Sequence, residues 1–206
     1  MSQNLDVRKV EQRVWRASQQ DGLMEVAIGI LLAATALQIR VTGLIALWIV
    51  VLVSLAPGLE AIRKRVTYPR IGYVELAQEE PKKTVRGIGV YTLGVFAGLA
   101  LAFAIFGDIG DWRLWSRWSP TLSGVLLSGG MIYAAGKSGA ARYYAFMVLA
   151  VGLGIAFSIL VPEPYTNLTL YLLMLGGVFI LCGAITFLRF LHKNPLPAEE
   201  AVDGAE

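Results

Sequence analysis

Six long apolar segments, with nearly all of the positive charge on one side of them, constrain this chain more than any other feature. We expect membrane-spanning helices at six ranges: 22–39, 41–59, 88–107, 120–136, 143–161 and 168–190. A helix needs about 20 apolar residues to cross the hydrocarbon core of a bilayer. Six such spans occupy most of a 206-residue chain, so the sequence predicts a single all-α, polytopic membrane bundle.

The composition agrees with a surface that contacts lipid. Only 16% of the residues are charged, whereas a soluble domain carries about 25%. The long stretch 22–59 is too long for one span, because a single helix over it would measure about 57 Å at 1.5 Å per residue. We therefore expect a helical hairpin that turns near Arg40.

The distribution of Lys and Arg predicts the orientation. All but three of the 18 fall on the side of the termini; the exceptions are Arg40, Arg113 and Arg117. Short cytoplasmic loops of membrane proteins carry an excess of positive residues. The sequence therefore predicts cytoplasmic N- and C-termini and insertion into a plasma (inner) membrane.

The segments before the first span and after the last span are more polar than the spans. Residues 1–20 are expected to form an amphipathic cytoplasmic surface helix, with Trp15 as an interfacial anchor. Contact with the membrane is the favoured interpretation, and a partner-binding helix is the alternative. The domain of six spans is expected over 21–191, followed by a disordered cytoplasmic tail over 192–206.

A tryptophan-rich segment precedes the fourth span. Trp112, Trp115 and Trp118 are spaced at i, i+3 and i+6, which places them along one flank of a helix. We expect an outer interfacial helix over 108–119 whose aromatic rings lie among the headgroups. An aromatic cage for a cationic ligand is the alternative.

Small residues at one-turn spacing predict how the spans pack, because helices in lipid need close backbone approach. Such stripes occur in four spans, with members Gly29 and Ala33, Gly94, Gly98 and Ala102, Gly124 and Ser128, and Ala150, Gly154 and Ser158.

Glu25 is the first candidate for a functional residue. It lies one turn inside the first span, on the same stripe as Asp21 and Gly29, so its carboxylate should point into the bundle. Ionisable groups within a span are costly and are candidates for function. The structural alternative is helix capping by Asp21 together with charge pairing of Glu25.

The cytoplasmic loop 60–87 supplies the remaining candidates. The run from Arg63 to Leu76 is rich in Val, Thr, Tyr and Ile, which predicts a short extended hairpin with a turn near Pro69. Arginine forks bind phosphate oxygens, so this loop is a candidate site for an anionic lipid headgroup. Its candidate residues are Glu60, Arg63, Tyr68, Arg70 and Tyr73. Topological anchoring and protein docking are the alternatives, and Arg70 is also placed to pair with Glu25 or Glu60.

Two stretches of the chain resemble a family. TYPRIGYVEL after the second span and DGLMEVAIGILL at the start of the first are similar to small, uncharacterised prokaryotic multi-span membrane proteins. The resemblance implies no activity. It implies that the following residues belong to one site: Asp21, Gly22, Glu25, Tyr68, Pro69, Arg70, Gly72 and Tyr73.

The sequence contains no catalytic constellation. One histidine and one cysteine exclude the usual zinc sites, and no cofactor is expected. Gly136-Lys137-Ser138 follows a membrane helix and lacks the first glycine of a phosphate-binding loop, so no nucleotide is expected there. Topology explains the excess of basic residues, so nucleic acid is not an expected partner either.

Three function classes remain. The favoured class binds an anionic lipid or small amphiphile at the cytoplasmic leaflet, as a sensor, carrier or modulator. The second is a small transporter or channel that uses Glu25 and Arg70. The third is a regulatory or structural partner subunit of a membrane complex. A homodimer or a partner membrane protein is a further expected association.

Overall fold

All of the regular secondary structure in the described part of the chain is helical. A computed structural model describes residues 21–71, 89–91, 93–94, 96–98, 100, 112–163 and 165–195. Within these ranges there is no strand. The long helices are α2 (Leu23–Arg40), α3 (Ile45–Ile62), α6 (Trp112–Ser138), α7 (Arg142–Leu160) and α8 (Thr166–Lys193). The all-α prediction is confirmed for this part of the chain.

Four helices are long and apolar enough to cross a membrane. They are α2, the continuous helical stretch Ile45–Arg70, α7 and α8. This supports the predicted class, an integral membrane protein. Helix α6 has 27 residues, but serines, glycines and charged residues lower its hydropathy. The span expected at 88–107 lies largely outside the described residues, so the six-span topology and its orientation remain predictions.

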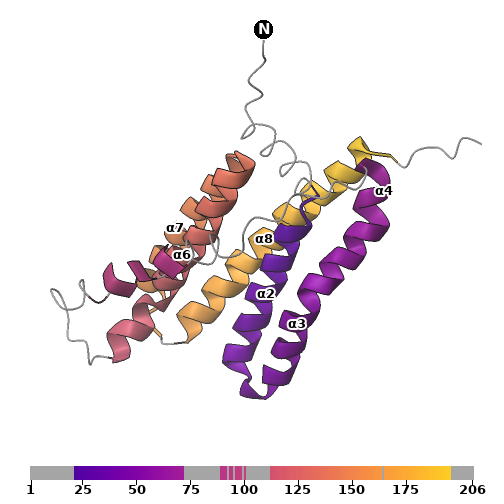
Figure 1. Cartoon of the computed structure of the whole chain (residues 1–206). Helices are drawn as coiled ribbons and strands as arrows, with labels where there is room; N and C mark the ends of the chain where they lie inside the picture. The colour runs from indigo at the N-terminus through magenta and orange to yellow at the C-terminus, as the bar shows by residue number, and fades with distance from the viewer. Residues whose placement is uncertain are drawn as a thin grey trace, which may run out of the picture.

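The predicted break between the first two spans is confirmed. Helix α2 ends at Arg40, Val41 is extended, and the short helix η1 (Thr42–Leu44) leads directly into α3. At the other end of α3 the chain continues through a π-helical turn, η2 (Arg63–Thr67), and α4 (Tyr68–Ile71). Figure 1 shows α3 beside α2, on the flank of the bundle away from α6 and α7.

Helices α2 and α8 pack closely in antiparallel orientation through glycines seven residues apart on each helix. A Cβ built on Gly29 would lie 2.6 Å from the carbonyl oxygen of Gly176, and one on Gly22 would lie 2.5 Å from that of Gly183. Such contacts require glycine because the opposing atoms belong to the backbone. Gly22 also has a φ of 69°, a left-handed conformation that starts α2 with little strain only at glycine.

Helices α6 and α7 also pack closely through glycines. A Cβ on Gly124 would lie 2.6 Å from the oxygen of Ala150, and one on Gly154 would lie 2.8 Å from that of Pro120. The hydroxyls of Thr121 and Ser158 share a hydrogen bond of 2.8 Å across the interface. The predicted packing role of these two stripes is confirmed. By contrast, Gly94 and Gly98 have no described atom within 4 Å of a built Cβ, so their predicted packing role is not confirmed.

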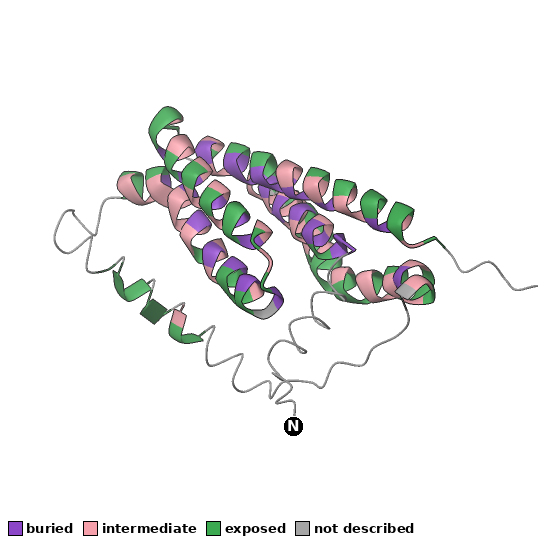
Figure 2. Cartoon of the chain, turned by 90° about the horizontal axis from the view of Figure 1, so that it is seen from above, coloured by how far each residue is buried: buried purple, intermediate pink, exposed green. Residues whose placement is uncertain are grey.

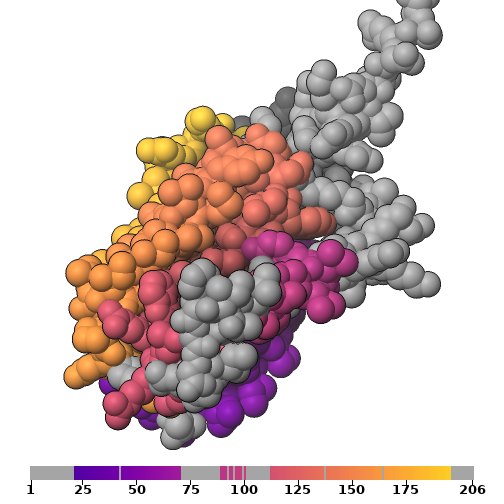
Figure 3. Space-filling model, turned by 90° about the vertical axis from the view of Figure 1, so that its left-hand side faces the viewer, coloured from indigo at the N-terminus to yellow at the C-terminus, as the bar shows by residue number. Residues whose placement is uncertain are grey.

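Buried aromatic side chains join the helix pairs. Phe146 of α7 stacks on Phe179 of α8 with ring centroids 4.5 Å apart. Tyr171 is fully buried, and its hydroxyl donates to the carbonyl of Ala150. Figure 2 shows that the buried residues gather on the sides of the helices that face each other. Figure 3 shows part of the outer surface that α6, α7 and α8 form on the left-hand side of the bundle.

The prediction of an extended hairpin after the second span is wrong for residues 63–71. This segment is helical, and α3 passes through Pro57 instead of ending before residue 60. The π-helical turn places Arg63 and Thr67 one turn apart, where both contact Asp21. These tertiary contacts outweigh the weak strand propensity of Val66, Thr67 and Tyr68. Residues 72–76 fall outside the described residues.

The tryptophan segment also differs from the prediction. Trp112–Ser138 form one continuous helix, so this segment begins the helix of the expected fourth span and is not a separate element. Pro120 lies inside it, where its carbonyl contacts Gly154. The first turns are tied down further by Asn167, whose amide donates to the carbonyls of Ser116 and Arg117 at 3.2 and 2.9 Å.

The glycine contacts predict a sharp difference between two neighbours on α8. A Cβ on Gly176 would lie 2.9 Å from the carbonyl oxygen of Gly29, whereas Gly177 has nothing within 4 Å. We expect Gly176→Ala to lower the free energy of unfolding by about 1–3 kcal/mol, as overpacking does. Gly177→Ala should cause no loss. Equilibrium unfolding in mixed SDS micelles measures both, and equal effects would contradict the close approach.

Candidate functional site

Two buried carboxylates mark the start of α2. Asp21 is 0% exposed and Glu25 is 2% exposed. They lie four residues apart and therefore on one face of the helix. This is the same face that carries Gly29 toward α8, so the glycine contacts fix the rotation of α2 and direct both carboxylates into the protein.

Asp21 is held by four donors. Arg63 approaches it as a fork, with Nε 3.0 Å from Oδ2 and Nη2 3.4 Å from Oδ1. The Thr67 hydroxyl donates to Oδ2 at 3.4 Å, and the backbone N–H of Leu23 donates to Oδ1 at 3.2 Å. The last bond confirms that Asp21 helps to cap α2. Through Arg63 and Thr67, it also ties the end of α3 to the start of α2.

Glu25 is paired but less completely satisfied. Nη2 of Arg142, the first residue of α7, lies 2.9 Å from Oε1 of Glu25. The distance makes an ion pair, yet neither carboxylate oxygen accepts a hydrogen bond with proper alignment. Arg142 also donates to the hydroxyl of Tyr143 at 3.1 Å, and its guanidinium lies 5.0 Å from the centre of that ring. Charge pairing of Glu25, the structural alternative, is therefore observed.

The four charges form two ion pairs one helical turn apart on α2, and we call them together the charged cluster: Asp21, Glu25, Arg63 and Arg142. Its formal charge is zero, and it connects three parts of the fold: the start of α2, the end of α3 and the start of α7. Buried charges at such a position are tolerated only when they are paired. The charged cluster can hold α2, α3 and α7 in their relative positions. Glu25, whose hydrogen bonds are poorly aligned, is the member best suited to exchange partners.

The other predicted residues lie apart from the charged cluster. Glu60 accepts from the Tyr68 hydroxyl at 3.4 Å and lies 3.7 Å from Nζ of Lys64, in a partly exposed group. Arg70 is half-buried, and its Nε is buried without a hydrogen-bond partner among the described residues. The pairings considered for Arg70 are corrected: Glu25 pairs with Arg142, and Glu60 with Lys64. Tyr73 and Trp15 fall outside the described residues.

Sequence reasoning missed Arg142, Thr67 and Tyr143. Arg142 was counted only as a topological charge at the start of the fifth span. The depth of each charged residue along its span would have identified it. A buried carboxylate one turn inside a span needs a positive partner, and Arg142 lies at a similar depth at the start of another span. Arg63 was among the candidates, but its partner Asp21 was not foreseen.

The three tryptophans at the start of α6 differ in exposure. Trp112 is 62% exposed and lies beside Tyr165, with ring centroids 6.2 Å apart, whereas Trp115 and Trp118 are half-buried. Three rings around one cavity would be needed for a cage, and none of the cavities described contains any of these residues.

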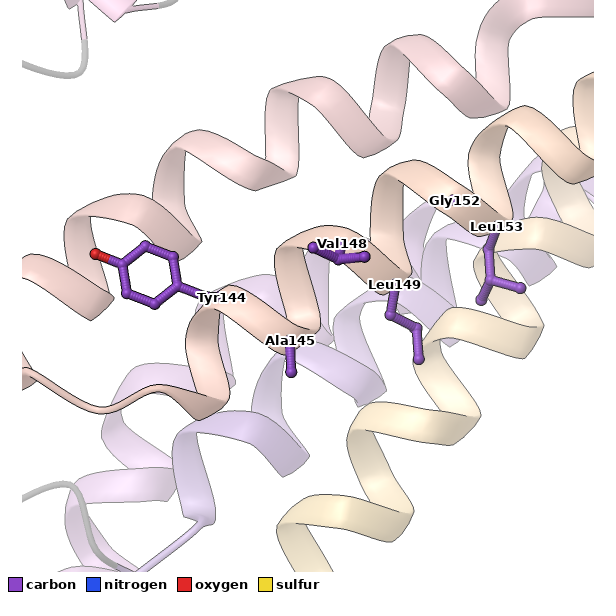
Figure 4. A pocket seen from close by; sticks show the side chains of 6 residues that line it. All are labelled: Tyr144, Ala145, Val148, Leu149, Gly152 and Leu153. Atoms are coloured by element: carbon purple, nitrogen blue, oxygen red, sulfur yellow. The ribbon is translucent and has the colours of Figure 1, made fainter.

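A wide, shallow hollow of about 570 Å³ on α7 is a weaker candidate (Figure 4). All of its side chains come from this single helix, and none is charged. Its lining residues are Tyr144, Ala145, Val148, Leu149, Gly152 and Leu153. Groups of three or more potential metal ligands are also lacking within the described ranges.

Comparisons with known proteins leave this site without a precedent. No protein-family model matches the chain, and no curated protein or solved structure is significantly similar to it. The resemblance to uncharacterised prokaryotic membrane proteins therefore stays a prediction.

The geometry of the charged cluster predicts which residues are energetically coupled. In a double-mutant cycle, Glu25→Gln and Arg142→Gln should be non-additive by about 1 kcal/mol or more, because the two side chains are in contact. Glu25→Gln and Arg70→Gln should be additive within about 0.5 kcal/mol, since no contact joins them. Equilibrium unfolding in mixed SDS micelles provides the four free energies of each cycle. Coupling to Arg70 instead of Arg142 would contradict this arrangement.

Proposed function

We propose that this integral membrane protein binds an anionic lipid or small anionic amphiphile at the cytoplasmic leaflet, as a sensor, carrier or modulator. The site is the segment from Lys64 to Arg70 at the end of α3, together with the apolar surface of α3 below it. The clustering of Lys and Arg on the side of the termini supports the cytoplasmic placement of this segment.

The observation that carries the proposal is that the basic residues after α3 differ in whether they already have a partner. Arg63 is taken up by Asp21, so it adds no net charge to the surface. Lys64 and Arg65 are exposed, and Arg70 keeps a buried Nε without a hydrogen-bond partner among the described residues. A buried donor of this kind is costly when unsatisfied. When the half-buried guanidinium turns outward, an anionic phosphate oxygen would satisfy this donor.

The surface next to these charges suits the hydrocarbon part of an amphiphile. Helix α3 has no buried residue, and its exposed side chains include Val50, Val53 and Ile62. An apolar helix that ends in a basic turn matches the two parts of an anionic lipid. The acyl tails would lie beside the helix, and the headgroup would lie at the basic residues. Each Lys or Arg near an anionic leaflet contributes about 1 kcal/mol.

Native mass spectrometry of the gently solubilised protein tests the proposal. We expect wild-type protein to retain phosphatidylglycerol, and Arg70→Gln to retain at least tenfold less. The matched control is Arg189→Gln, which removes an exposed arginine near the end of α8 and should leave retention unchanged. Equal retention in the Arg70 variant would overturn the proposal. Protein free of lipid in all three samples would favour the partner-subunit class.

A second candidate function is transport, and the observation that favours it is Glu25. A carboxylate that is 2% exposed, with neither oxygen in an aligned hydrogen bond, is a group that can change partner during a transport cycle. Vesicles containing the protein should then show a proton or substrate flux that falls at least tenfold in Glu25→Gln. Vesicles without flux under a proton gradient would remove the proton-coupled form of this candidate.

A further inference from the structure

An apolar slot lies between α2 and α3, on the part of the bundle near their connecting turn. It has a volume of about 260 Å³. Its walls include Ala33, Ala34 and Leu37 of α2, and Leu47, Trp48 and Val51 of α3. None of its lining residues is charged. We propose that this slot binds one hydrocarbon chain of an anionic lipid from the leaflet around the α2–α3 turn, with Arg40 holding the headgroup.

The slot stays open because the two helices are held at both ends. The turn from Val41 to Leu44 joins them at one end, and the ion pair of Arg63 with Asp21 joins them at the other. Between these points, the small side chains of Ala33 and Ala34 leave space. The Trp48 ring does not collapse into that space, because its indole N–H donates to the Thr35 hydroxyl at 3.0 Å.

The dimensions favour a single chain over other occupants. Pockets for drug-sized ligands measure about 300–1,000 Å³, so this slot is smaller than most of them. A helix, with a diameter of about 10–12 Å, does not fit between α2 and α3. An empty apolar slot loses dispersion contacts along its walls, and water gains too few polar partners there. Both helices have the hydropathy of membrane spans, so lipid acyl chains would surround the slot.

Arg40 supplies the polar end of the site. It is the last residue of α2, about one turn beyond Leu37 at the edge of the slot, and it is exposed. Its Nη2 donates to the Thr166 hydroxyl at 2.9 Å, which holds the guanidinium at this end of the bundle. A guanidinium carries five N–H donors, so further donors remain for a phosphate. This site is separate from the proposed site at Arg70, at the opposite end of α3.

The experiment is photocrosslinking in vesicles of phosphatidylcholine that contain phosphatidylglycerol with a diazirine in one acyl chain. We expect crosslinks on the peptides that contain Ala33–Ala34 and Leu47–Val51. Ala34→Phe, which fills the slot, should lower their yield at least fivefold. The matched control is Ala46→Phe, which adds the same ring at an exposed α3 position that does not line the slot. Its yield should equal that of wild type.

Two further variants keep the proposal testable if Ala34→Phe fails to fold. Val51→Phe fills the slot from α3 and should have the same effect, whereas Leu47→Ala enlarges it and should keep or raise the yield. Arg40→Gln should remove the preference for labelled phosphatidylglycerol over labelled phosphatidylcholine. Unchanged crosslinking in both filling variants would overturn the chain site. An unchanged lipid preference in Arg40→Gln would overturn the role of Arg40.

Discussion

The pairing of two buried carboxylates with two arginines is the constraint on which the rest of this structure depends. Asp21 and Glu25 enter the protein at the start of α2, where an isolated charge would be strongly destabilising. Removal of one partner from a buried ion pair typically costs about 3–5 kcal/mol. Arg63 comes from the end of α3, and Arg142 comes from the start of α7. The two carboxylates are therefore paired only when α3 and α7 are correctly placed against α2.

Close glycine packing makes this charge network geometrically possible. Gly22 and Gly29 bring α2 against Gly183 and Gly176 of α8, and this contact sets both the depth and the rotation of α2. A helix held by larger side chains would stand farther from α8 and would place its carboxylates differently. Gly22 serves twice, since its left-handed backbone also starts the helix beside Asp21. The network therefore depends on residues that carry no charge themselves.

The exposed position of α3 connects both proposals. This helix has no buried residue, yet it is fixed at the α2–α3 turn and at the ion pair of Arg63 with Asp21. One end therefore presents Lys64, Arg65 and Arg70, while the other borders the slot near Arg40. A helix held at both ends and by the Trp48–Thr35 hydrogen bond can keep the rest of its surface exposed without separating from the bundle.

The sequence alone determined the class of protein, because apolar length and charge content depend on local composition. It also identified the acidic stripe on α2 and its glycine, since residues four apart share a helix face whatever the fold. Periodicity could not show that Arg142 would be the partner of Glu25, because that contact joins segments far apart in the chain. Nor could it show that 63–71 would be helical. There the strand propensity depends on its surroundings, and the donors of Arg63 and Thr67 reach Asp21 from the helical segment. Tertiary structure decided those two points, since the satisfaction of a buried charge depends on what lies around it in space.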